Sequence, residues 1–168
     1  MRLVLGKSGT LELGEFEDMS VEDFWAPVPS GHRRFWKAQP AAVPETGTQK
    51  IRGGKWTLGH SALLSLGFVF KDPSLHVQKG TAGYLERIAQ VVEKGARVFS
   101  CHAIPDHRVE RYVHRMPKHV QCIPYQALLD LGSLTTDSAL TAIGQSRHLG
   151  GGLLVPVDLP TDLFGGEE

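Results

Sequence analysis

At positions 142–156 the chain reads Ala-Ile-Gly-Gln-Ser-Arg-His-Leu-Gly-Gly-Gly-Leu-Leu-Val-Pro. Four glycines flank an adjacent arginine and histidine, and an apolar run follows. Glycine accepts positive φ angles and lets other groups approach the main chain, so successive N–H groups can converge on an anion. The stretch therefore predicts a phosphate-binding loop that leads into a buried strand. A mobile turn between a helix and a strand is the simpler alternative.

The side chains of this loop suit an anion as well. Arginine offers a planar fork of donors to phosphate, and histidine is a titratable proton carrier. The loop does not end in the Gly-Lys-Ser/Thr of a nucleotide-binding P-loop, and it precedes a strand rather than a helix. The residues predicted to bind the anion are Gly144, Gln145, Arg147, Gly150, Gly151 and Gly152.

Charge is balanced over the whole chain, with 18 basic and 18 acidic side chains, but it is unevenly distributed. Residues 1–30 hold two basic and six acidic side chains, residues 31–120 hold fifteen and six, and residues 121–168 hold one and six. The middle of the chain therefore carries a net charge of +9. This pattern favours a polyanionic partner, and a chance clustering of solvated charges is the alternative.

A chain of 168 residues is expected to form one main domain. We expect an acidic arm or linker over residues 1–33, the domain over residues 34–160, and an acidic tail over residues 161–168. The sequence has no apolar run of the roughly 18 residues that a membrane span requires. Two cysteines do not make a secreted disulfide framework. A cytoplasmic protein without membrane contact is therefore expected.

No metal or other cofactor is expected. A zinc site assembled from Cys101, His102, His107 and Cys122 would match no compact finger or knuckle spacing. Alternation along a strand would also send Cys101 and His102 to opposite faces.

Hydrophobic periodicity predicts the order of elements along the chain. In that order we expect an edge strand over 35–44, helices over 58–70 and 81–96, strands over 97–104 and 120–131, a short helix over 135–143 with Asp137 as a possible cap, and a last strand over 153–157. If one of the helices between residues 58 and 96 is an insertion, the order is βαββαβ. This order predicts an α+β, ferredoxin-like fold.

The stretch Leu140–Pro156 resembles the C-terminal glycine-rich signature of the RAMP superfamily, whose members process and bind CRISPR RNA. The closer likeness is to the C-terminal, processing half of the fused backbone and processing subunit of type I-U (I-G) CRISPR systems. Phe35–Glu45 and Tyr112–His119 add to the likeness, which spans about residues 34–160. Ser146 departs from it, because these loops often have a second glycine there. The additional backbone domain of the fused relatives is also missing, as expected of a fragment, a split gene or an internally started product.

The resemblance implies metal-independent cleavage of a CRISPR repeat RNA hairpin within a type I effector complex that contains other subunits. In this reaction a ribose 2′-hydroxyl attacks the adjacent phosphate, which requires a base, an acid and cations. His60, near the start of the first helix, and His148, in the glycine loop, are the candidate catalytic residues. His60 has an alternative role in capping a helix beside Trp56, and His148 has one as a hydrogen-bond donor to RNA.

The most basic segment of the chain, residues 106–119, is a second candidate RNA-binding element. If it is helical, three of its arginines lie three and four residues apart and form one cationic stripe, suited to the phosphates of a hairpin stem. Its predicted RNA-binding residues are Arg108, Arg111, Arg115, Lys118 and His119. A solvated basic face is the alternative.

Two other functions remain open from the sequence. A noncatalytic RNA-binding or assembly subunit could use the same loop and basic segment only to hold RNA or a neighbouring subunit. An enzyme acting on a small phosphate-bearing metabolite would need an acidic or metal-binding constellation, which the sequence does not display.

Overall fold

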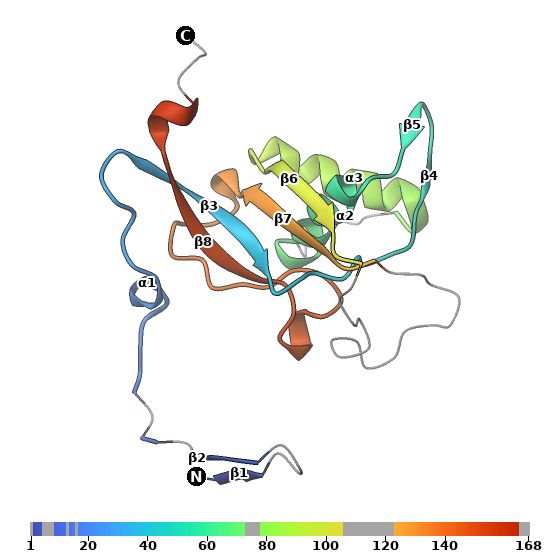
Figure 1. Ribbon diagram of the computed structural model, residues 1–168. Helices are drawn as coiled ribbons and strands as arrows, with labels where there is room; N and C mark the ends of the chain where they lie inside the picture. The colour runs from blue at the N-terminus through green and yellow to red at the C-terminus, as the bar shows by residue number, and fades with distance from the viewer. Residues whose placement is uncertain are drawn as a thin grey trace.

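A four-stranded antiparallel sheet forms the centre of the fold (Figure 1). The computed structural model describes residues 2–4, 9–12, 14–15, 17–72, 78–105 and 123–164. The strands of the sheet are β3 (His32–Gln39), β6 (Arg97–Ala103), β7 (Tyr125–Asp130) and β8 (Leu153–Pro160). Their spatial order is β6-β7-β3-β8. With two helices packed on this sheet, the expected α+β class is confirmed.

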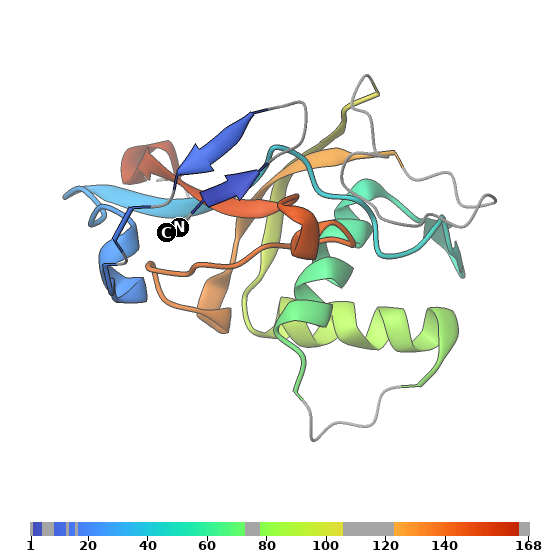
Figure 2. The same ribbon diagram turned by 90° about the horizontal axis from the view of Figure 1, so that it is seen from below.

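The two helices lie on one face of the sheet (Figure 2). They are α2 (Leu58–Val69) and α3 (Gly80–Glu93), which agree with the helices predicted over 58–70 and 81–96. Leu66 of α2 is fully buried in the hydrophobic core. No described helix is both long enough and apolar enough to cross a membrane.

β3 lies inside the sheet, between β7 and β8. The sequence predicted an edge strand over 35–44, because a proline cannot donate to the hydrogen-bond ladder. That prediction is wrong: β3 ends at Gln39, so Pro40 and Pro44 lie beyond the ladder and impose no edge position on it.

β8 forms an outer edge of the sheet, and its own prolines limit further pairing there. The N–H of Leu154 points away from β3, because it donates to the carbonyl of Thr141 at 2.9 Å. Alternate residues of a strand direct their N–H groups to the same side. Pro156 and Pro160 therefore lack donors on the outer side of β8, which discourages the addition of another strand.

The short helix predicted over 135–143 is absent. After a 3₁₀ turn, η3 (Gly132–Leu134), the chain has no helix over residues 135–146, and a second 3₁₀ turn at Arg147–Leu149 precedes the strand β8. A helix would use the carbonyls of Asp137 and Ala139 internally, but the guanidinium of Arg34 and the indole N–H of Trp25 donate to them instead. Tertiary hydrogen bonds have thus replaced the local ones. In chain order the sheet domain reads strand, helix, helix and three strands.

The residues before the sheet include a hairpin and one short helix. β1 (Arg2–Val4) pairs with β2 (Thr10–Glu12), and this hairpin lies apart from the four-stranded sheet (Figure 1). After α1 (Val21–Phe24), Trp25 packs against the hydrophobic core. The indole N–H of Trp25 donates a hydrogen bond of 2.8 Å to the carbonyl of Ala139, which fixes the end of the predicted arm to the domain.

A buried arginine joins β3, β8 and the two segments beside them. The side chain of Arg34 is 3% exposed, and its guanidinium donates two hydrogen bonds of 2.8 and 2.7 Å to Asp158. It also donates to the carbonyls of Ala26 and Asp137. Hydrogen bonding to Arg34 lowers the pKa of Asp158, and the same bond raises the pKa of Arg34. The pair therefore contributes to folding when Asp158 is ionised.

We expect Asp158→Asn to lower the free energy of unfolding by about 2 kcal/mol at neutral pH, because a neutral amide replaces the carboxylate beside a buried guanidinium. The pKa of Asp158 is lower in the folded than in the unfolded state. The contribution of the pair is therefore complete above the unfolded value of about 4, and it is lost as the pH falls through the folded value. Urea denaturation of both proteins at neutral and acidic pH measures this. A difference that does not shrink in acid would contradict the assignment.

Candidate functional site

The glycine-rich loop is attached to the segment that follows β3. The N–H of Gln145 donates to the carbonyl of Val43, and its side-chain amide donates to the carbonyl of Glu45, both at 3.0 Å. The guanidinium of Arg147 contacts the Glu45 carboxylate at 2.5 Å and the carbonyl of Gly144 at 2.9 Å. These contacts fix the position of the loop relative to residues 43–45.

Three of the four loop glycines are explained by the packing of the loop itself. A Cβ at Gly144 would lie 2.6 Å from the carbonyl oxygen of Val43, and one at Gly152 would lie 2.0 Å from that of Ile143. A Cβ at Gly151 would lie 2.3 Å from a side-chain atom of the same loop. All three glycines are buried, so they admit neighbouring protein groups where the sequence had suggested a ligand.

The exposed part of the loop is its apex, where η4 (Arg147–Leu149) ends. Gly150 is exposed, has φ of +83°, and has open space where a Cβ would lie. His148 is exposed as well. Several amides of the loop already have internal acceptors, since Arg147 donates to the carbonyl of Gly144 and Gly151 donates to that of Ser146. Anion binding would therefore be confined to this apex.

The positive charge of Arg147 is partly neutralised by the carboxylate of Glu45. Its side chain is 27% exposed, and that of Glu45 is 11% exposed. Burial raises the pKa of Glu45, and the nearby guanidinium opposes this effect only in part. The ion pair is therefore lost at a higher pH than it would be with an exposed glutamate. Arg147 thus has a positioning role within the loop besides any contact with an anion.

His60 occupies the third position of α2 and completes a capping box with Thr57. The N–H of Thr57 donates to Nδ1 of His60 at 3.1 Å, and the N–H of His60 donates back to the Thr57 hydroxyl at 3.3 Å. The imidazole also stacks on the indole of Trp56, with centroids 5.3 Å apart. His60 therefore has the helix-capping role that the sequence offered as an alternative. This role uses Nδ1 of the imidazole and not Nε2.

The two candidate histidines lie near opposite ends of α2. His148 borders a shallow pocket with Phe68 and Val69, at the C-terminal end of the helix. His60 is in the first turn, so Phe68 lies about 12 Å further along the helix axis at 1.5 Å per residue. The structure therefore does not bring these histidines together as an acid and base pair around one pocket.

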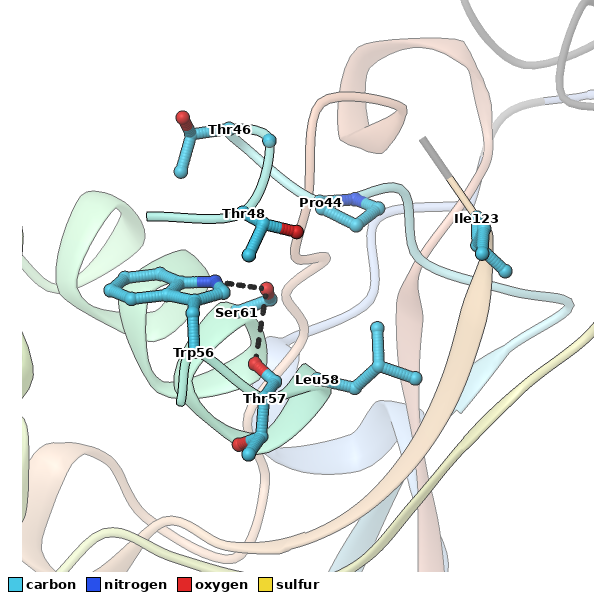
Figure 3. Close-up of a pocket in the computed structure, with 9 residues that line it drawn as sticks. Pro44, Thr46, Thr48, Trp56, Thr57, Leu58, Ser61 and Ile123 are labelled. Atoms are coloured by element: carbon cyan, nitrogen blue, oxygen red, sulfur yellow. Dashed lines mark hydrogen bonds between the residues drawn. The ribbon is translucent and has the colours of Figure 1, made fainter. Parts of the chain in front are cut away.

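A pocket of about 200 Å³ lies at the start of α2 (Figure 3). Trp56 and Thr48 border one side of it, and Leu58, Pro44 and Ile123 border the other. Most of its polar lining consists of hydroxyl groups, and the indole N–H of Trp56 donates to one of them, Ser61 Oγ, at 3.0 Å. Because ligand pockets usually enclose 300–1,000 Å³, this one suits a single group such as a base, a sugar or a phosphate.

Cations adjoin this pocket along the chain. The hairpin of β4 (Lys50–Ile51) and β5 (Gly54–Lys55) directly precedes Trp56, and it presents exposed Lys50, Arg52 and Lys55. Ile123, on the other side of the pocket, follows the basic segment of the sequence. The predicted residues Arg108, Arg111, Arg115, Lys118 and His119 of that segment lie outside the described residues.

The start of α2 and Ile123, which follows the basic segment in the sequence, line this pocket, and the glycine loop is attached beside it through Glu45. Glu45, which holds the loop, stands between the pocket residues Pro44 and Thr46. Sequence reasoning missed Trp56 and the threonines of the pocket. The available signal in the sequence was a tryptophan that stands after Lys50, Arg52 and Lys55 and directly before the capping residue of a helix.

No zinc arrangement is visible in the part of the chain that the structure describes. Cys101 packs toward the core and His102 is exposed, as strand alternation predicted. Burial raises the pKa of Cys101 to about 11, so its thiol stays protonated at neutral pH. Within the described ranges, no three His, Cys, Asp or Glu side chains are placed to hold a metal ion. His107 and Cys122 lie outside those ranges.

Comparisons of the chain with models of protein families, with characterised proteins and with solved structures found no match.

Proposed function

We propose that this protein is a metal-independent endoribonuclease that cleaves CRISPR repeat RNA and keeps the product within a cytoplasmic type I effector complex. The observation that carries the proposal is a pocket lined by the start of α2 and by Ile123, which follows the basic segment, with the glycine loop held beside it through Glu45. His60 stands in the same first turn of α2. The pocket has hydroxyl donors, an indole and neighbouring cations, which suit a ribose phosphate chain.

The sheet supports the same proposal. We interpret its order, β6-β7-β3-β8, as that of a ferredoxin-like unit in which the central strands are the first and third in the chain. In this interpretation the irregular segment between β7 and β8 takes the place of the second helix. The glycine loop then directly precedes the last strand, as the resemblance to RAMP proteins implies.

The reaction has two proton transfers. The ribose 2′-hydroxyl loses a proton to a base as its oxygen bonds to phosphorus, and the P–O5′ bond breaks as the 5′ oxygen takes up a proton. The products carry a 2′,3′-cyclic phosphate and a 5′-hydroxyl. This chemistry uses a nucleophile that the RNA itself supplies.

His60 suits the second of these transfers. In the neutral ring, Nδ1 accepts the Thr57 N–H, so the hydrogen is on Nε2. In the charged ring, Nδ1–H can donate to the Thr57 hydroxyl oxygen 2.8 Å away. Nε2 therefore carries a hydrogen in both states and can donate to a phosphate oxygen. From the charged ring it can also transfer a proton to the leaving 5′ oxygen.

The test uses labelled CRISPR repeat RNA incubated with the protein in EDTA. We expect one cut near the base of the hairpin, with a cyclic phosphate on one product. The matched control is the same RNA with a single 2′-deoxyribose at the cut site, which should bind equally well and remain intact. Cleavage of the deoxy substrate, or failure to cleave either RNA, would overturn the proposal.

A noncatalytic RNA-binding or assembly subunit is the second candidate. It is favoured by the structural partners of the predicted catalytic and binding groups, since His60 caps α2 and Arg147 pairs with Glu45. Tight binding of the repeat RNA without any cut would support this alternative.

A further inference from the structure

The face of the sheet opposite the helices carries a cluster of aromatic rings, separate from the main core. The ring of Phe35 in β3 packs against that of Phe99 in β6, with centroids 4.8 Å apart. It also packs against that of Phe164 in η5 (Thr161–Phe164), with centroids 4.9 Å apart. Phe35 is fully buried, whereas Phe99 is 47% and Phe164 is 38% exposed. Figure 2 shows that α2 and α3 lie on the other side of the sheet.

A β-bulge directs Phe99 to this face. The pairing of β6 with β7 shifts register between Val98 and Ser100, so Phe99 has no partner across the ladder. Val98 and Cys101 pack on the core side, and the two residues between them are exposed. Bulges often redirect a side chain at functional sites. An aromatic ring held half exposed at such a bulge is available for a ligand.

Cations surround these rings. Arg33 and Lys37 flank Phe35 on β3 at alternate positions, and Arg97 lies two residues before Phe99 on β6. Arg33 lies over the Phe35 ring, 5.5 Å from its centroid, while 53% of its side chain stays exposed. One carboxylate, Asp130, pairs with Arg33. The net charge of this set is positive.

The mixture of aromatic rings and cations indicates which class of partner this sheet face binds. The centres of protein interfaces are depleted of charged residues, particularly lysine, whereas here cations alternate with rings along the strands. Single-stranded nucleic acid is bound by this combination, because bases stack on aromatic rings and phosphates pair with cations. A duplex keeps its bases stacked on each other and could not use the rings.

We propose that this open sheet face binds single-stranded RNA, with bases stacked on Phe99 and Phe164 and phosphates held by Arg33, Lys37 and Arg97. The inference rests on the proposed function only for the identity of the polymer. The sheet face is separate from the pocket at the start of α2. The sheet face would therefore bind the unpaired part of an RNA whose hairpin lies at the pocket.

The test measures binding of the full chain to a labelled polyuridine RNA of about 12 nucleotides, a length within the range of such sites. Phe99→Ala and Phe164→Ala should each weaken binding about tenfold, the loss typical of one stacked base. Phe99→Tyr should restore it. The matched control is Leu163→Ala, which removes a neighbouring apolar side chain that is 67% exposed. Thermal unfolding of each variant checks that the fold is kept.

The outcomes separate this inference from the proposed function. Unchanged polyuridine affinity in both phenylalanine variants overturns the inference even if the repeat hairpin is still cut. Loss of polyuridine binding in a protein that cuts no RNA supports the inference and overturns the proposed nuclease. A loss that is equally large in the Leu163 variant would show that stacking on the rings does not determine RNA affinity, and it would overturn the inference.

Discussion

Replacement of His60 by glutamine is expected to lower the rate of repeat RNA cleavage by about 10²- to 10⁴-fold, the usual contribution of one proton-transferring group. Glutamine at the third position of a helix can still accept the N–H of the capping residue, so the capping box with Thr57 should survive. Stability and RNA affinity are therefore expected to stay near those of the wild type. Single-turnover cleavage in EDTA, anisotropy binding and thermal unfolding provide the three measurements.

Two further variants make the result specific. His60→Ala should lose the same activity and also about 1 kcal/mol of stability, because it removes the side-chain half of the cap. His102→Ala replaces an exposed histidine on β6 and should cut normally. If the glutamine variant cuts at the wild-type rate, His60 has a capping role only, and the same assay on His148→Ala would then test the remaining candidate.

The helices α2 and α3 and the four strands of the central sheet could be predicted because their signals are local. The apolar spacing of residues 81–92 marks α3, and the glycine at 95 follows its end. The irregular segment at 135–143 could not be predicted in this way. Its carbonyls are bound by Arg34 and Trp25, which are more than a hundred residues away in the chain, so long-range contacts override a weak local preference.

The candidate site was predictable only in part, for the same reason. The glycines and His60 stand out by residue type, but their partners do not. Nothing in the sequence around Glu45 indicates that it will bind Arg147, and that contact sets how much of the arginine is free for an anion. Conversely, Thr46 and Thr48 are ordinary loop residues until folding brings them beside Trp56.

The glycine loop itself provides the second large prediction. Gly152→Ala should lower the free energy of unfolding by about 3 to 5 kcal/mol. Its φ of +71° disfavours an L side chain, and the added Cβ would lie 2.0 Å from the carbonyl oxygen of Ile143. That carbonyl belongs to backbone and has little freedom to move. Gly150→Ala is the matched control, because its φ of +83° is similar but nothing lies near the added methyl group.

The control should cost only about 1 kcal/mol, the penalty of the backbone conformation alone. Urea denaturation of the two variants therefore isolates the packing requirement at Gly152 from the requirement for positive φ. Equal losses would mean that the loop relaxes around the new methyl group and that close approach to Ile143 does not require glycine. The same pair of variants examines function, since a stable Gly150→Ala protein with weakened repeat RNA binding would place the RNA at the exposed apex of the loop.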